Sequence, residues 1–163
     1  MGSEMCIRDR ITVAIAVSDN TRPVPYNCTH EEKILSPILH RLERAGIEKQ
    51  NIKIIIGTGA HAPTSQEWKR SAFGEEVCRL YQLEDHDCYS QDLISIGKVK
   101  GVPVRINKNF FQSDLHIVTG LVESHFMAGA SGGRLSLIHI SEPTRLLSIS
   151  YAVFSLQKKK HNQ

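Results

Sequence analysis

Two runs of β-branched residues, separated by one amphipathic stretch, most constrain what this chain can fold into. Residues 11–17 and 52–56 are almost wholly apolar, as strands buried on both faces are. Between them, apolar residues recur every three to four positions over 31–45, which predicts a helix with one buried face. Pro37 predicts a kink or a late start, and Gly46 ends the helix. A strand, a helix and a strand in this order form a βαβ unit with a parallel sheet.

The elements after the second strand continue the same alternation. Thr64 and Glu67 have the spacing of a capping box, which predicts a helix from there to about Phe73, with Gly74 at its end. The remaining predicted elements are a strand over 77–83, an edge strand over 101–107 that contains Pro103, one helical turn over 110–114 and a short buried strand over 115–118. The expected fold class is therefore α/β, with Rossmann-like βαβ units and a mainly parallel sheet.

Three loops that carry polar residues come directly after predicted strands. They cover residues 18–25, 57–64 and 120–134, and each contains a histidine or an arginine. The carboxyl ends of strands are where open α/β sheets bind ligands. Glycines in the third loop let backbone N–H groups approach an anion such as phosphate closely, although a glycine-rich loop alone is more often just a turn.

The three loops carry motifs that resemble a known family. The motifs are Ser-Asp-x-Thr-Arg-Pro-x-Pro at 18–25, Thr-Gly-x-His-x-Pro at 58–63 and Glu-Ser-His-x-x-x-Gly-x-Ser-Gly-Gly-Arg at 123–134. Together and in this order they resemble the N-terminal domain of the lactate racemase family, the nickel-pincer-nucleotide racemases and epimerases of 2-hydroxy acids. The similarity runs from about Ile11 to Arg134, and the resemblance implies a second, C-terminal domain as a partner in the same protein.

The resemblance implies a set of site residues. His61 and His125 would be the paired acid/base residues, one for each enantiomer, since imidazole exchanges protons near neutral pH. Arg22 could hold the substrate carboxylate or a cofactor phosphate, and Asp19 could orient Arg22 or a histidine or form a turn. The full set expected to bind substrate or cofactor is Asp19, Thr21, Arg22, Gly59, Glu123, Gly129, Ser131, Gly132, Gly133 and Arg134.

The expected chemistry is the interconversion of C2 stereoisomers of a small 2-hydroxy acid. The C2 hydrogen is too weakly acidic for easy removal as a proton, whereas its removal as hydride leaves a stable keto acid. No side chain accepts hydride, so a cofactor must, and in the family this is a nickel-pincer nucleotide. The lysine that anchors it covalently would come directly after Arg134, where this chain has Leu135, and the nickel-ligating histidine lies further on. No metal ligand is therefore expected within this chain.

Both ends of the chain resemble translated sequencing adapter. Residues 135–145 are what one transposon-end adapter encodes, and its reverse complement after a GTG start encodes residues 1–9. We therefore expect 1–10 and 135–163 to be adapter-derived and 11–134 to be a partial N-terminal catalytic domain, truncated before the second domain. As written, this polypeptide is expected neither to hold the cofactor covalently nor to racemise a hydroxy acid.

Composition excludes several other classes. The chain has 20 Lys+Arg and 17 Asp+Glu, and most of that small excess lies in the two ends, so neither nucleic acid nor an acidic membrane surface is an expected partner. Outside the ends, Cys28, Cys78 and Cys88 form an odd, widely spaced set, typical of a reducing cytoplasm. No apolar stretch in the sequence is long enough to be a transmembrane span.

Two other functions remain open from the sequence. A metal-dependent hydrolase could use His61, His86, Asp87 and His125, but these lack a compact ligand spacing. A non-catalytic domain that binds a nucleotide or phosphate differs from the racemase interpretation only in the natural residues expected after Arg134.

Overall fold

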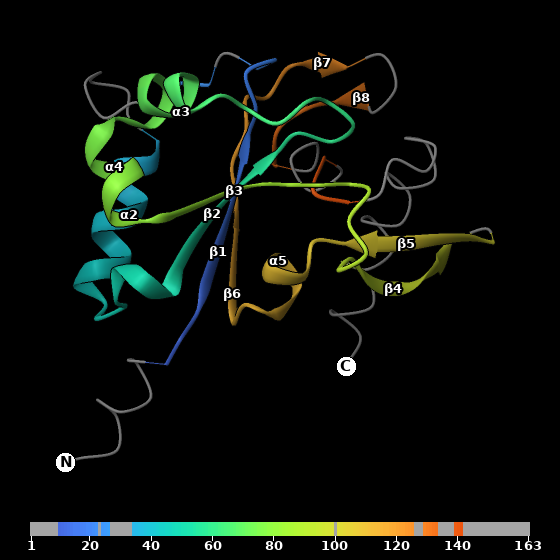
Figure 1. The fold of residues 1–163 in the computed structure, drawn as a ribbon, viewed down its shortest axis with the longest axis horizontal. Coiled ribbons are helices and arrows are strands. Elements are labelled where there is room, and N and C mark those ends of the chain that lie inside the picture. The colour runs from blue at the N-terminus through green and yellow to red at the C-terminus, as the bar shows by residue number, and fades with distance from the viewer. Residues whose placement is uncertain are drawn as a thin grey trace.

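A four-stranded parallel sheet forms the centre of the computed structural model, which describes residues 10–22, 24–26, 34–99, 101–125, 129–133 and 139–141. The strand order is β3-β2-β1-β6, and every neighbouring pair is parallel, which confirms the predicted α/β class (Figure 1). The strands are β1 (Val13–Ser18), β2 (Ile52–Gly57), β3 (Gln82–Asp85) and β6 (Leu115–Val118). Their carboxyl ends therefore all lie at one edge.

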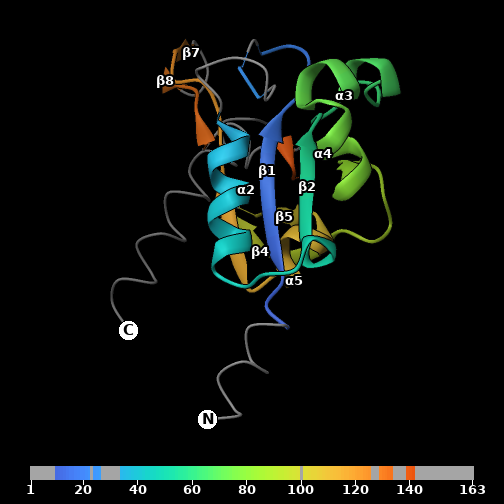
Figure 2. The same ribbon diagram turned by 90° about the vertical axis from the view of Figure 1, so that its left-hand side faces the viewer.

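Three helices cover one face of the sheet (Figures 1 and 2). They are α2 (Leu35–Arg44), α3 (Gln66–Phe73) and α4 (Glu75–Leu80), and a short 3-10 turn, η1 (Lys49–Asn51), leads into β2. Alternate residues of β1 and β2, such as Ile15 and Ile54, are fully buried here against Leu35 and Leu39 of α2. Residues 31–33 lie outside the described residues, and the helix predicted over 31–45 is confirmed from Leu35 to Arg44.

The opposite face packs against a smaller layer. Ala14, Ala16 and Ile55 lie against Phe110 of α5 (Lys108–Gln112) and Ile106 of β5 (Val102–Ile106). The short side chains of β1 on this face let the second layer approach closely. Burial on both faces is why β1 and β2 are continuous apolar runs.

The strand β5 belongs to a separate antiparallel hairpin with β4 (Ile94–Val99), which projects from the body of the molecule (Figure 1). Sequence analysis predicted β5 as an edge strand and missed β4. Pro103 is tolerated because a two-stranded hairpin consists only of edges. A second small hairpin, β7 (Ser124–His125) with β8 (Gly129–Ala130), comes after β6.

Three local predictions were wrong. Residues 77–83 are not one strand, because Gly74, at φ 87°, ends α3 and allows α4 to begin at Glu75, so that only Gln82 and Leu83 of this range belong to a strand. The α3 helix is capped by Ser65, whose Oγ accepts from the Trp68 N–H at 3.1 Å, and not by Thr64. The strand β6 is not buried, because it is an edge strand of the described sheet and its residues are mostly exposed.

Residues 139–141, which sequence analysis set aside as adapter-derived, pack into this fold. Ile140 is fully buried in the second layer, its carbonyl accepts from the Asn107 N–H at 3.0 Å, and Ser141 forms a β-bridge with Ile106. The assignment of 135–163 as an adapter-derived tail stays a prediction. Within the described residues, no helix is long and apolar enough to span a membrane.

The chain crosses itself closely where the loop after β6 begins. A Cβ built on Gly120 would lie 2.7 Å from the backbone carbon of Gly132. We expect Gly120→Ala to lower the free energy of unfolding by about 1–3 kcal/mol, because the two backbones would have to separate. Chemical denaturation would measure this. Val122→Ala, at a side chain that is 77% exposed, is the control and should change stability by less than about 0.5 kcal/mol.

His86, directly after β3, is a buried imidazole that is 3% exposed, and neither ring nitrogen has a hydrogen-bond partner among the described residues. Burial lowers the pKa of His86 from its ordinary 6.5, opposed in part by the Ser141 backbone and by the carboxylates of Asp87 and Glu84. The unfolded chain therefore binds the proton first as pH falls.

We expect the free energy of unfolding to decrease as pH drops below 6.5, the ordinary value that the unfolded chain keeps, until the lower pKa of folded His86 is reached. His86→Leu should flatten this part of the pH profile and leave stability at pH 7 unchanged or raised, because an apolar side chain replaces an unpaired polar ring. Urea denaturation between pH 5 and 8 measures both effects. An unchanged slope in His86→Leu would exclude His86 as the cause.

Candidate active site

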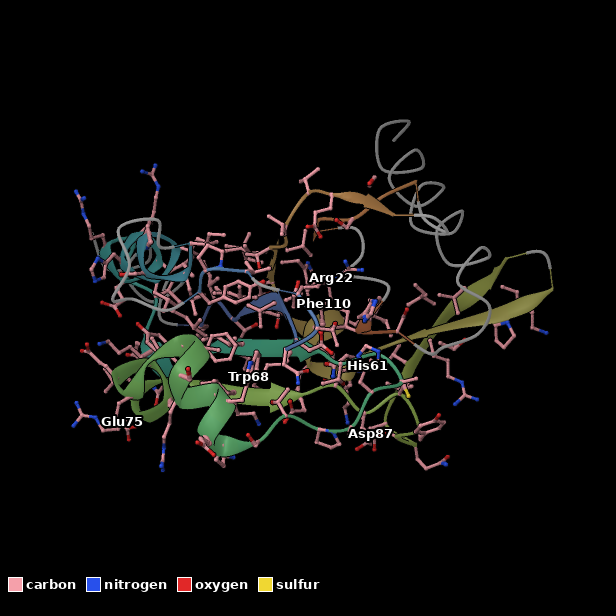
Figure 3. The ribbon with its side chains drawn as sticks, turned by 90° about the horizontal axis from the view of Figure 1, so that it is seen from above. Arg22, His61, Trp68, Glu75, Asp87 and Phe110 are labelled. Atoms are coloured by element: carbon pink, nitrogen blue, oxygen red, sulfur yellow. The ribbon has the colours of Figure 1, made fainter. Side chains whose placement is uncertain are left out.

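The carboxyl edge of the sheet gathers most of the residues that the motifs predicted. The loops after β1, β2 and β6 meet there because β1 lies between β2 and β6 and is parallel to both. Figure 3 looks onto this edge and shows Arg22 and His61 over the middle of the molecule, with Glu75 at its periphery. The loops are far apart in sequence, so only the sheet brings them together.

The closest contact in the site joins Asp19 to His61. The Nδ1 atom of His61 lies 2.6 Å from Oδ2 of Asp19, which is 2% exposed, whereas the His61 side chain is 47% exposed. Of the three roles considered for Asp19, two are seen at its side chain: Oδ2 orients a histidine, and Oδ1 accepts from the Thr21 N–H in a local turn. An imidazole whose Nδ1–H donates to a carboxylate keeps the Nε2 lone pair for an incoming proton.

The second oxygen of Asp19 is occupied by Thr21. The Thr21 Oγ donates to Asp19 Oδ1 at 2.6 Å, and its backbone N–H does so at 3.2 Å. The buried carboxylate thus has partners on both oxygens, as burial of a charged group requires. Thr21, predicted as a binding residue, contributes here by fixing the carboxylate that holds His61.

Arg22 connects the first loop to the third. Its Nη1 lies 3.4 Å from Oε2 of Glu123, with the two side chains 29% and 44% exposed. A partly exposed pair at this distance contributes little stability. It does place a guanidinium, which can bind a carboxylate or phosphate with two parallel hydrogen bonds, at the same edge as His61.

The third loop folds back on itself through Ser131. The Ser131 Oγ donates to the Leu121 carbonyl at 2.6 Å and accepts from the Glu123 N–H at 2.8 Å, and the Ser131 N–H donates to the Glu123 carbonyl. Of the predicted residues, Gly129 stands opposite His125 in the β7–β8 register. This places the backbone of His125 in a loop that is tied to Glu123.

The other predicted glycines have local roles. Gly132 has φ 101°, a left-handed conformation that favours glycine, and a Cβ on Gly133 would lie 2.8 Å from Cγ2 of Val118. Gly59, at φ 58°, donates its N–H to the His139 carbonyl. Anion binding by these residues stays a prediction, and Arg134 lies outside the described residues.

The residues that anchor the His61 loop were not predicted from the sequence. At its start, the Thr58 Oγ donates to the His86 carbonyl at 2.6 Å. At its end, Oδ1 of Asp85 accepts from both the Oγ and the N–H of Thr64, while the buried Lys69 donates to Oδ2. The Thr64–Glu67 spacing concealed this role, because it indicated a helix cap.

The metal-dependent hydrolase interpretation gains no support from the geometry. Across the described parts of the chain, no group of three His, Cys, Asp or Glu side chains could hold a metal ion. Asp87 accepts from the Tyr89 N–H and so forms a local turn. The His86 ring is buried, and the His86 carbonyl accepts a hydrogen bond from Thr58 at the start of the His61 loop.

Comparison with known proteins agrees with the motifs. The family profile "Lactate racemase N-terminal domain" matches residues 3–143. Lactate racemase from Lactiplantibacillus plantarum is 34% identical over 137 residues, which cover 83% of this chain and 31% of that protein. Lactate racemase from Thermoanaerobacterium thermosaccharolyticum is 36% identical over 128 residues, which cover 77% and 29%.

Solved structures give the same result. The lactate racemase apoprotein from Thermoanaerobacterium thermosaccharolyticum matches with a TM-score of 0.71 and 32% identity, over 85% of this chain and 33% of that one. A Thermotoga maritima protein shares the fold, with a TM-score of 0.63 and 19% identity over 92% of this chain and 38% of that one. The chain spans about a third of the length of its curated relatives. The profile match over most of the chain and the identity to both racemases place this chain in the lactate racemase family, within its N-terminal domain.

Proposed function

We propose that this chain is part of a racemase or epimerase that interconverts the C2 stereoisomers of a 2-hydroxy acid of the lactate type. The observation that carries the proposal is the Asp19–His61 pair, with 2.6 Å between carboxylate and imidazole, at a sheet edge that also presents Arg22. A base for a hydroxyl proton and a cation for a carboxylate are the two groups that a 2-hydroxy acid requires.

Three side chains of the chain would divide substrate binding and proton transfer between them. Arg22 would bind the substrate carboxylate and so fix the C2 carbon relative to His61. His61 would take the hydroxyl proton at Nε2 while Asp19 stabilises the imidazolium at Nδ1. His125, on the third loop, would do the same for the opposite enantiomer.

A cofactor is needed to complete this chemistry, and the family resemblance implies a nickel-pincer nucleotide. The donor set fits such a nucleotide in part: the Ser131–Gly133 turn lies on the third loop, and Gly132, at φ 101°, has a left-handed conformation that could bring backbone N–H groups close to a phosphate. The covalent lysine and the nickel-ligating histidine are expected beyond Arg134. When bound, the nucleotide supplies the hydride acceptor that no side chain provides.

The test is to resequence the source DNA across codon 134 by a method that does not use this adapter, and to express the full protein. The racemase proposal expects a lysine after Arg134 and a histidine-bearing second domain. The product formed from lactate in D2O should retain hydrogen at C2, since hydride does not exchange with solvent. Deuterium at C2 would contradict hydride transfer. A natural continuation without the lysine and histidine would favour the nucleotide- or phosphate-binding domain.

Within that full-length enzyme, Asp19→Asn and His61→Gln should each lower kcat at least about 100-fold, because positioned acid/base catalysis contributes at least that much. His61→Gln and His125→Gln should each abolish single-turnover keto-acid formation from one enantiomer and retain it from the other. His40→Gln, at an exposed histidine of α2, is the matched control and should not change the rate. If one variant lost keto-acid formation from both enantiomers, the assignment of one histidine base to each enantiomer would be excluded.

A further inference from the structure

A buried tyrosine joins the ends of two strands that carry the site. The Tyr26 hydroxyl accepts from the Ser18 N–H at 2.8 Å and lies 3.0 Å from the Thr119 Oγ. The Thr119 Oγ in turn donates to the Ala16 carbonyl at 2.9 Å. Ser18 ends β1, and Thr119 comes directly after β6.

These contacts determine which group donates in each of the three hydrogen bonds. Because the Thr119 hydroxyl gives its hydrogen to Ala16, it can only accept from Tyr26, and the tyrosine hydroxyl therefore donates to Thr119. The result is one continuous chain from the Ser18 N–H through two hydroxyl groups to the Ala16 carbonyl. Hydrogen bonds arranged in one direction polarise and strengthen one another.

The position of Tyr26 makes the chain rigid. Tyr26 is 2% exposed and belongs to the main core cluster, and its ring lies 5.6 Å from that of Phe73. Thr119 is 8% exposed. A buried hydroxyl without partners would be costly, so the ring is held in the one position where its oxygen reaches both strand ends.

The segments that meet at Tyr26 are two of the three that carry the candidate site. Asp19 comes after Ser18, Arg22 lies between Asp19 and Tyr26 in the first loop, and Thr119 leads into the loop of Glu123. We infer that Tyr26 and Thr119 are positioning residues that set the distance between the Asp19–His61 pair and the Arg22–Glu123 pair. The inference rests on the proposed function for its catalytic meaning, whereas its geometry can be tested alone.

The experiment uses the 163-residue chain, labelled with 15N, and monitors two NMR signals. Tyr26→Phe keeps the ring and removes the acceptor of the Ser18 N–H, so that amide should exchange with solvent about tenfold faster, as the loss of one buried hydrogen bond predicts. The Nδ1–H signal of His61 should shift or broaden, because Asp19 loses its fixed neighbour. Thr119→Val should affect the His61 signal in the same way, whereas Thr119→Ser keeps the hydroxyl and should restore it.

Tyr81→Phe is the matched control. Tyr81 comes directly before β3, at the end of the sheet opposite the site, and its hydroxyl donates to Glu43 of α2. Removing this hydroxyl should therefore leave both NMR signals unchanged. If Tyr26→Phe speeds the exchange of all backbone amides equally, including that of Ile55 in the centre of the sheet, Tyr26 only stabilises the fold and the inference is wrong. An unchanged His61 signal in Tyr26→Phe would overturn it equally. If the signals respond as expected but the full-length protein does not racemise, only the proposed function fails.

Discussion

Parallel pairing of β1 with both β2 and β6 is the constraint on which the site depends. The register pairs Ser18 with Gly57 on one side and Ala16 with Val118 on the other. Each of the three loops therefore begins within a few ångströms of the next. The pairing itself is stable because β1 is buried on both faces, with branched side chains toward α2 and alanines toward α5. One strand thus supports both the core and the candidate active site.

The candidate site is built from pairs of residues that join different loops. His61 is fixed by Asp19 of the first loop, Arg22 contacts Glu123 of the third, and Tyr26 connects the first loop to the end of β6. A single loop could not hold these groups, because loops gain their precision from the rigid elements beside them. Among these pairs, the half-exposed His61 is held by the buried carboxylate of Asp19.

Much of this arrangement could be predicted from the sequence. The long apolar runs gave β1 and β2 within two residues, and three motifs in order identified the loops at their ends and after β6. The short strand β6 was predicted over 115–118 as observed, whereas local patterns did not distinguish the break at Gly74 from a strand start and did not predict β4. The contacts of Tyr26, Asp85 and Lys69 could not be predicted either. They join residues 8 to 93 positions apart, and no spacing rule in one sequence connects them.

The Arg22–Glu123 pair also affects how a ligand would reach the site. With its carboxylate neighbour, the guanidinium presents almost no net charge to the solvent, so an approaching anion feels little attraction until it is within a Debye length. An anion that binds must then exchange places with Glu123 at the arginine. Such a site selects ligands at short range, by how well a carboxylate fits the two N–H donors of the guanidinium, and not by long-range attraction between charges. The association rate of a small anion should therefore depend only weakly on ionic strength.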